Sequence, residues 1–279
     1  MLNYGLAGRV VVVSGGTSGI GLASAIALAR DGAHVAVLGT NQERMDAAVD
    51  RVREAGGGKA KVLGLIADVR SPAALATAAG SVAAELGEVY GLITSAGIAG
   101  AAKAEDMTLE ELYNVFAINV GGVLSTCQAF VHGMLARGNG SIVLIGSVNS
   151  LGGQPGRMHY TASKHAVLGM VKNLAIEWGR RGVRVNGIAP GPVDTPLIRR
   201  NVPPTFFASV FEDRIPLGRL ARGEEIASAS LMLLSDAASF VNGAMLVVDG
   251  GMTAGPFTRR RGADFGSRRL LEAGLYEEE

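Results

Sequence analysis

Short apolar runs alternate with longer alanine-rich stretches along most of the chain, and this alternation limits the possible folds more than any other feature. Runs such as Val10-Val-Val-Val13 and Ile142-Val-Leu-Ile145 are apolar at every position, which is typical of strands buried on both faces of a parallel sheet. Repeated strand–helix units require right-handed crossovers, which place helices on both faces of the sheet. The pattern predicts strands at 10–14, 34–39, 61–67, 90–94, 141–147, 183–189 and 244–248, and helices near 19–31, 41–55, 72–86, 108–137, 159–181 and 222–235.

No linker interrupts this alternation between residues 9 and 250, so the sequence predicts a single domain over residues 1–254. The proline-rich stretch 190–221 breaks the rhythm, and long irregular connections of this kind are usually functional. We interpret it as a substrate lid that carries a short helix. Residues 255–279 hold clustered basic and acidic side chains, and we expect a C-terminal extension that is either solvated or docked on a neighbouring subunit.

Composition and charge limit the compartments and partners that suit the protein. A hydrophobic content of 48% supports a large core, and a net charge of +1 gives no overall field that would attract nucleic acid or an anionic membrane. The single cysteine, Cys127, excludes an intramolecular disulfide and fits a reducing compartment. No apolar run approaches the length of a membrane span, and the histidines show no metal-ligand spacing. We therefore expect a cytoplasmic protein with no metal, no nucleic-acid partner and no membrane partner.

A glycine-rich loop, Ser14-Gly-Gly-Thr-Ser-Gly-Ile-Gly21, follows the first predicted strand and opens the first predicted helix. Backbone N–H groups and the positive end of the helix dipole favour a negative charge there, and a pyrophosphate fits where no Cβ blocks its approach. Glycines alone are weak evidence, because ordinary turns also need them. Their position between the first strand and the first helix makes this a predicted dinucleotide site.

Tyr160 and Lys164 are four residues apart near the start of a predicted helix, so both side chains lie on one helical face. A tyrosine has an ordinary pKa near 10, and a neighbouring ammonium is expected to lower that pKa by favouring the phenolate. Tyr160 would then take the proton of an alcohol while hydride leaves for a nicotinamide. Ser147, at the end of an apolar strand, would hydrogen-bond the substrate oxygen at the carboxyl edge of the sheet.

Other polar and aromatic residues allow two interpretations. Asn119 stands in an apolar helical stretch, where a packing amide is the simpler role. Asn149 and Gln154 either line the substrate pocket or pack locally. Phe206, with its neighbours in the proline-rich stretch, either lines the pocket or forms the core face of the short helix.

These segments resemble the short-chain dehydrogenase/reductase family from about residue 6 to residue 251. The glycine spacing is that family's G-x-x-x-G-x-G, and Ile145-Gly146-Ser147 matches the segment of its catalytic serine. One segment departs: Thr94-Ser95-Ala96-Gly97 stands where the family has Asn-Asn-Ala-Gly, so we expect a cost in stability rather than in activity. The other matching segments are Ala67-Asp68-Val69, Tyr160 to Lys164, Asn186 to Thr195 and Val241 to Gly251.

The resemblance implies a doubly wound Rossmann-type parallel sheet of seven strands, in the order 3-2-1-4-5-6-7. It implies an oxidoreductase that uses NAD or NADP to interconvert a secondary alcohol and a ketone, assembled as a homotetramer or dimer through its long helices. Asn119 would hold a water that links Lys164 to solvent, and Pro192 would line the substrate pocket beside Ser147. The implied cofactor residues are Gly15, Thr17, Ser18, Gly19, Ile20, Gly21, Gly39, Thr40, Asn41, Asp68, Val69, Ala96, Gly97, Tyr160, Lys164, Pro190, Gly191, Val193 and Thr195.

Selectivity between NAD and NADP is normally set just after the second strand, where this chain has Gly39-Thr40-Asn41. No carboxylate there would repel a 2′-phosphate, and no cation would neutralise it. Ser18 in the glycine loop is also neutral. Both cofactors are allowed, and we favour NADP.

Three other functions can be set against this interpretation. A catalytically silent dinucleotide sensor or scaffold on the same fold would be expected to lack part of the Ser147, Tyr160 and Lys164 set, yet all three are present. A hydrolase with Ser147 as nucleophile would need a G-x-S-x-G turn, which is absent. Reduction of a ketone carried on an acyl thioester would require a basic surface near the pocket, for which Arg199 and Arg200 are candidates.

Overall fold

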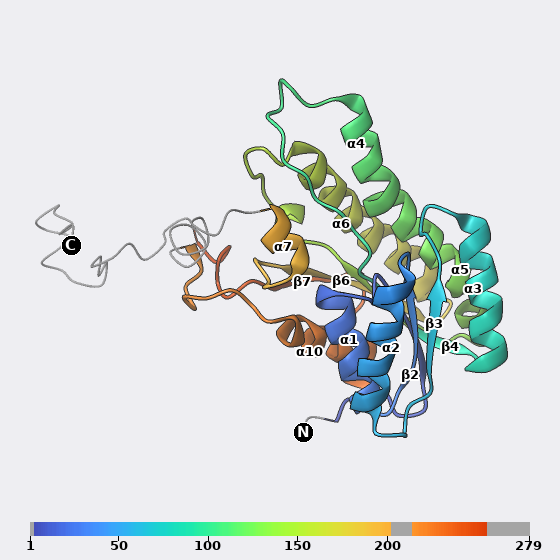
Figure 1. Cartoon of the computed structure of the whole chain (residues 1–279). Helices are drawn as coiled ribbons and strands as arrows, with labels where there is room; N and C mark the ends of the chain where they lie inside the picture. Colours follow the sequence, from blue (N-terminus) through green and yellow to red (C-terminus); the bar gives the residue numbers. More distant parts are fainter. Residues whose placement is uncertain (1–2, 202–213, 256–279) are drawn as a thin grey trace, which may run out of the picture.

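Seven parallel strands form one sheet in the order β3-β2-β1-β4-β5-β6-β7, which is the order that the family resemblance implied (Figure 1). The computed structural model describes residues 3–201 and 214–255. The strands are β1 (Val10–Ser14), β2 (His34–Gly39), β3 (Val62–Ile66), β4 (Val89–Thr94), β5 (Gly140–Ile145), β6 (Val183–Pro190) and β7 (Met245–Val248). The predicted doubly wound α/β fold is confirmed.

Helices cover both faces of the sheet (Figure 1). On one face α1 packs against α2 and α10, and on the other α3 packs against α5 while α4 packs against α6. The helices are α1 (Gly19–Arg30), α2 (Gln42–Gly56), α3 (Pro72–Glu85), α4 (Leu109–Phe116), α5 (Gly122–Arg137), α6 (Met158–Gly179), α7 (Pro196–Asn201) and α10 (Gly223–Leu234).

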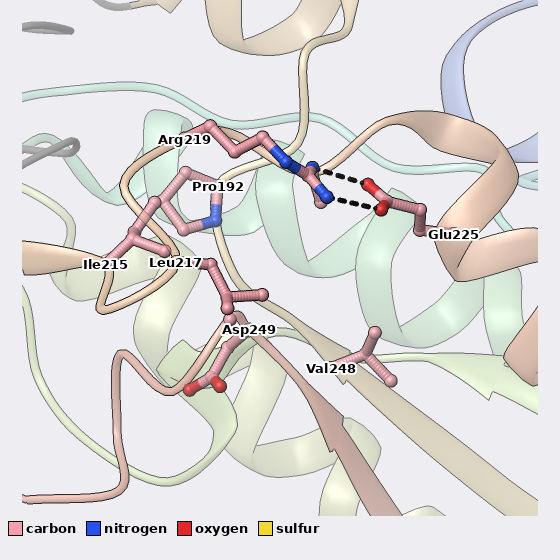
Figure 2. A pocket seen from close by; sticks show the side chains of 9 residues that line it. Pro192, Ile215, Leu217, Arg219, Glu225, Val248 and Asp249 are labelled. Atoms are coloured by element: carbon pink, nitrogen blue, oxygen red, sulfur yellow. Dashed lines mark hydrogen bonds and ion pairs between the residues drawn. The ribbon is translucent and has the colours of Figure 1, made fainter.

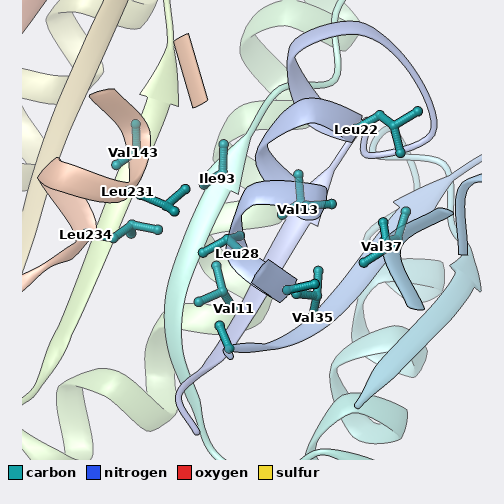
Figure 3. Close-up of a cluster of buried hydrophobic side chains, with 14 of the residues drawn as sticks. Val11, Val13, Leu22, Leu28, Val35, Val37, Ile93, Val143, Leu231 and Leu234 are labelled. Carbon is teal, nitrogen blue, oxygen red and sulfur yellow. The ribbon is translucent and has the colours of Figure 1, made fainter. Parts of the chain in front are cut away.

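Each helical layer encloses its own apolar core. Side chains alternate between the faces of a strand, so Val11 and Val13 of β1 belong to the core under α1 and α10, together with Leu28 and Leu231 (Figure 3). Val10 and Val12 of the same strand belong to the opposite core. Burial of both alternating sets explains why the sequence of this strand is apolar at every position.

Most element ends lie within one or two residues of the sequence prediction, and two differences bear on the site. The helix expected over 108–137 begins at a capping box of Thr108 and Glu111, but a π-helical turn at Ala117–Gly121 separates α4 from α5. Helical periodicity gives no sign of this turn, and such turns are frequent at functional sites. Strand β5 ends at Ile145, so Ser147 does not end the strand as expected. It instead caps a short 3₁₀ turn at Val148–Ser150.

The stretch from Leu109 to Arg137 is the one helix, among residues 3–201 and 214–255, whose length and composition would suffice to cross a membrane. Within this fold α5 packs against β4, β5 and α3. Its buried side chains, among them Phe130 and Met134, belong to one of the two cores. Helix α5 therefore belongs to one of the helical layers that cover the sheet, and its apolar side chains pack in the core of this domain.

The short helix expected within the proline-rich stretch is present as α7. Phe206 and its aromatic neighbours, predicted to line the substrate pocket or to pack on this helix, lie outside the described residues. Of the expected C-terminal extension, only Gly255 lies within them.

Candidate active site

The predicted cofactor residues follow the carboxyl ends of β1, β2, β3, β4 and β6, so the parallel sheet brings them to one edge. The strand order reverses between β1 and β4, and ligands of open α/β sheets bind at such a switch point. The loops after these two strands are in contact, because a Cβ on Gly15 would lie 2.6 Å from the backbone nitrogen of Ala96. A Cβ on Gly19 would lie 3.2 Å from Cγ2 of Thr195, which places the loop after β6 beside them.

The glycine loop is shaped to receive an anion. Gly15 and Gly19 have φ angles of +68° and +52°, and a Cβ on Gly21 would lie 2.3 Å from the Gly15 carbonyl oxygen. Only glycine fits these positions. The N-cap Ser18 makes no side-chain hydrogen bond, so no side chain of the cap occupies the N–H groups in the first turn of α1. Free N–H groups at a helix N-terminus fit the pyrophosphate of a dinucleotide.

The residues predicted at the adenosine end surround the end of β2. A Cβ on Gly39 would meet Cγ2 of Thr17 at 2.6 Å, which places the two in contact. The Asn41 side-chain oxygen accepts a hydrogen bond from the Arg44 backbone at 2.9 Å and so caps α2. Its amide hydrogens remain free to donate to a ligand. Thr40 is exposed beside it.

Asp68 is held by a residue that the sequence analysis missed. Arg70 Nη2 donates to Asp68 Oδ2 at 2.6 Å, and Arg70 Nε contacts both carboxylate oxygens at 3.1 Å. This hydrogen bonding lowers the pKa of Asp68 below its ordinary value. Asp68, one of the implied cofactor residues, is therefore a charged and oriented hydrogen-bond acceptor. Proximity of two residues in sequence was the only available signal.

The predicted catalytic side chains converge at the carboxyl end of β5. Lys164 Nζ donates to the Ile145 carbonyl oxygen at 2.8 Å and lies 5.7 Å from the centre of the Tyr160 ring. Ser147 is buried beside Tyr160, and its Oγ accepts from the Asn149 backbone at 3.1 Å. The structure therefore brings a phenol, an ammonium and a hydroxyl together at the edge where the cofactor loops meet.

Burial governs the ionisation of this group. Lys164 is only 6% exposed, and desolvation lowers its pKa to about 8. Burial raises the pKa of Tyr160, while the Ser147 hydroxyl and the Arg157 charge act in the opposite direction. The expectation that Lys164 lowers the pKa of Tyr160 is therefore wrong for the chain alone. The ammonium is bonded to the Ile145 carbonyl, and it does not offset the desolvation of the phenolate.

Asn119 lies in the π-helical turn and is fully buried. Its Oδ1 accepts from the Ile98 backbone at 2.9 Å, and its Nδ2 donates to the Ile98 carbonyl at 2.9 Å and to Ser163 Oγ at 3.1 Å. The amide thus ties the loop after β4 to α6, as the packing interpretation requires. The water-holding role remains a prediction. A Cβ on Gly97 would lie 3.3 Å from this amide oxygen and 4.0 Å from Lys164 Nζ.

The predicted substrate residues fall into two places. Asn149 is buried, and its Nδ2 donates to Thr161 Oγ1 at 3.0 Å and to Gln154 Oε1 at 3.3 Å, close to Ser147. Pro192 instead lines a hollow of about 100 Å³ between the ends of β6 and β7 and the start of α10 (Figure 2). Apolar Ile215 and Val248 share that hollow.

An ion pair between Arg219 and Glu225 forms one wall of the hollow at Pro192 (Figure 2). Arg219 donates to both oxygens of Glu225 at 2.7 and 2.8 Å, and this pairing lowers the pKa of Glu225 to about 2. Each charge is already satisfied by the other. None of the residues predicted as catalytic lines this hollow, so the substrate role of Pro192 remains a prediction.

Two buried hydroxyls mark the segment that departs from the family pattern. Ser14 of β1 and Thr94 of β4 are register partners, and neither hydroxyl has a hydrogen-bond partner within the described residues. Leaving buried polar groups unpaired costs stability. This arrangement agrees with the stability cost expected from the missing amides.

Comparisons with known proteins agree with this geometry. A family model described as Enoyl-(Acyl carrier protein) reductase matches residues 15–253. The chain is 40% identical to D-threitol dehydrogenase of Mycolicibacterium smegmatis over 251 residues, covering 90% of this chain and 95% of that protein. It is 38% identical over 250 residues to gluconate 5-dehydrogenase of Gluconobacter oxydans, covering 90% and 96%.

A solved structure is also similar. The gluconate 5-dehydrogenase of Burkholderia cenocepacia J2315, in complex with NADP and tartrate, superposes with a TM-score of 0.85 at 33% identity. The match covers 91% of this chain and 98% of that one. The chain belongs to the short-chain dehydrogenase/reductase family.

Replacing Lys164 by Met should expose the cost of burying its charge. Between pH 8 and 10.5 the unfolded chain retains a proton on Lys164 that the folded chain has lost. Wild-type stability should therefore rise relative to Lys164→Met by on the order of 3 kcal/mol across this range. Urea unfolding of both proteins at pH 7 and above pH 10 measures the change.

Lys172→Met, on the exposed side of the same helix, is the control and should show no comparable change. A constant difference between wild type and Lys164→Met across the pH range would contradict the buried, destabilised ammonium.

Proposed function

We propose that the protein catalyses reversible hydride transfer between a secondary alcohol and a nicotinamide, with Tyr160 as general acid and base. The observation that carries this proposal is the convergence of Tyr160, Lys164 and Ser147 at the edge where the cofactor loops meet. An NAD(P)-dependent oxidoreductase acting on alcohol and carbonyl groups also agrees with the dehydrogenase names of its relatives. All three side chains are present, and nothing favours a silent sensor or scaffold.

The residues divide the work as follows. Tyr160 Oη takes the alcohol proton during oxidation and returns it during reduction. Ser147 Oγ hydrogen-bonds the substrate oxygen and stabilises the negative charge that develops there. Lys164 fixes α6 against the end of β5 through the Ile145 carbonyl, and Asn119 fixes the loop after β4 against α6. A nicotinamide bound at this edge would supply or accept the hydride, and the positive charge of its oxidised form would favour the phenolate.

Partial burial of Tyr160 makes the cofactor part of its activation. Desolvation raises the pKa of this phenol in the chain alone, so the phenolate is scarce without a second positive charge nearby. An oxidised nicotinamide beside the phenol would supply that charge. The base would then form chiefly when the cofactor is in place.

The residues at the adenosine end accept NAD or NADP, and we favour NADP. The segment Gly39-Thr40-Asn41 presents no carboxylate, and the Thr40 hydroxyl and Asn41 amide can donate hydrogen bonds to a phosphate. The related gluconate 5-dehydrogenase of known structure holds NADP.

Steady-state kinetics with each cofactor tests this preference. The Michaelis constant should be lower for NADP than for NAD, because only NADP adds hydrogen bonds at its 2′-phosphate. A strong preference for NAD would overturn the assignment.

We further propose a homotetramer or dimer that assembles through α4, α5 and α6. Leu109, Tyr113, Leu124 and Ile176 of these helices are large apolar side chains left exposed. Beside Leu124, the small residues Gly121 and Gly169 border a shallow apolar hollow that could receive a second copy. Large apolar side chains left exposed beside such a hollow are what an interface between copies of the chain would cover.

Sedimentation velocity tests the assembly. Wild type should sediment as a dimer or tetramer, and Ile176→Glu should reduce the assembled fraction because it buries a charge in the contact. The exposed Glu43→Gln on α2 is the control and should sediment as wild type. A monomeric wild type at micromolar concentration would contradict the proposal.

We assign the protein to the cytoplasm, with a small alcohol or ketone as partner and without a nucleic-acid or membrane partner. The sequence has one cysteine, Cys127, so it forms no intramolecular disulfide, which suits a reducing compartment. The near-neutral net charge of +1 supports the same assignment.

Replacing Tyr160 by Phe should lower kcat at least about a thousandfold, because the variant loses its proton carrier. Dinucleotide binding, measured by fluorescence titration, should be retained, since the glycine loop is unchanged. Turnover is measured against a panel of secondary alcohols and the corresponding ketones.

Tyr4→Phe, which removes a phenolic hydroxyl remote from this edge of the sheet, is the matched control and should keep wild-type turnover. Wild-type rates in Tyr160→Phe would remove the proposed catalytic role.

A further inference from the structure

The side chain of Arg157 joins the loop after β4 to the end of α7, the short helix in the predicted substrate lid. Arg157 lies immediately before α6, three residues ahead of Tyr160. Its Nη1 donates to the Gly100 carbonyl at 2.5 Å, and its Nη2 donates to the Asn201 carbonyl at 3.1 Å. Gly100 belongs to the loop that follows β4, and Asn201 is the last residue of α7. A planar guanidinium suits this bridge because its donors point in two fixed directions.

The positive charge of Arg157 is not neutralised by a neighbouring acid. Among residues 3–201 and 214–255, no carboxylate forms an ion pair with it. The side chain is partly buried, so solvent screens its field less than on an open surface. Tyr160 follows three residues later in the first turn of α6, where the positive charge of Arg157 acts to lower the pKa of its phenol.

Other charged groups near the start of α6 leave this effect in place. Lys164 is bonded to the Ile145 carbonyl. His159 is buried and faces Glu111 of α4, and burial lowers the pKa of His159. Beside α7, Arg199 pairs with Asp194 at 2.7 Å, so these charges offset each other. Arg157 is therefore the cation whose charge acts on the phenol without a carboxylate partner in the described part of the chain.

We propose that Arg157 is a positioning residue of the reaction: it fastens the end of α7 to the loop after β4 and presents a positive charge to Tyr160. This inference rests on the proposed function, because it assigns the role of Arg157 through the proton carrier of that reaction. By favouring the phenolate, the charge brings Tyr160 closer to the form that takes the alcohol proton. By holding α7, the bridge fixes one wall beside the substrate.

The two roles separate in two variants. Arg157→Lys keeps a positive charge, but a single ammonium cannot reproduce the forked bridge to both carbonyls. Arg157→Gln removes both the charge and the bridge. Arg180→Gln is the matched control, because it makes the same exchange at an exposed position at the other end of α6.

Two measurements on the full-length protein, without substrate or cofactor, test the inference. The first is the tyrosinate absorbance as a function of pH, with the Tyr160→Phe signal subtracted to isolate Tyr160. Arg157→Gln should shift this titration to higher pH, while Arg180→Gln should titrate as wild type. Arg157→Lys is left to the second measurement, because a lysine with an ordinary pKa of about 10.4 loses its charge in the pH range where the phenol titrates. A purely structural role for Arg157 would leave the Tyr160 titration unshifted in Arg157→Gln.

The second measurement is amide hydrogen exchange of α7. Both Arg157 variants should exchange about threefold to tenfold faster there than wild type, because the fastening hydrogen bonds are lost. Arg180→Gln should not. Unchanged exchange in both Arg157 variants, or an unshifted Tyr160 titration in Arg157→Gln, would overturn the proposal.

Arg157→Lys alone still tests the bridge if Arg157→Gln does not fold, and it should then give faster exchange in α7 than wild type. A Lys variant with wild-type exchange would overturn the proposal. Because neither readout uses turnover, failure here is distinguishable from failure of the proposed function, which rests on the kinetics of Tyr160→Phe.

Discussion

The hydrogen bond from the Lys164 ammonium to the Ile145 carbonyl is the interaction on which the site depends. It fixes α6 against the end of β5, so that Tyr160, one helical turn away, stands beside Ser147. The arrangement is unfavourable for both ionisable groups, because burial disfavours the charged form of each. Lys164 has no carboxylate partner within residues 3–201 and 214–255, and a buried ammonium of this kind weakens the fold. Such costs are typical of sites kept for chemistry.

The parallel sheet makes this cluster useful by bringing distant segments to the same edge. Gly15 and Ala96 touch at the point where the strand order reverses, and Gly19 touches Thr195 from the other side. Close backbone approach, rather than side-chain chemistry, defines this half of the site. The Asn119 amide connects the two halves, because it binds both Ile98 after β4 and Ser163 of α6.

Much of this could be predicted because it depends on local pattern. Val10 to Val13 are apolar on both faces of their strand. The capping box of Thr108 and Glu111 depends only on residue types within four consecutive positions. The missed features depend on contacts between distant segments. The bridge from Arg157 to Gly100 and Asn201 has no local signature, and the π-helical turn around Asn119 has the apolar pattern of an ordinary helix. The pKa of Tyr160 was predicted in the wrong direction because sequence spacing shows a neighbouring charge but not the depth of burial.

We propose that Tyr160 becomes a usable base only when an oxidised nicotinamide lies beside it. Ultraviolet titration of its phenol in the presence and absence of oxidised dinucleotide measures this directly, with the spectrum of a protein lacking that hydroxyl as the reference. We expect the Tyr160 phenol to ionise above the ordinary tyrosine range in the free protein, and at clearly lower pH in the complex with oxidised dinucleotide. Ionisation at the same pH in both states would contradict it.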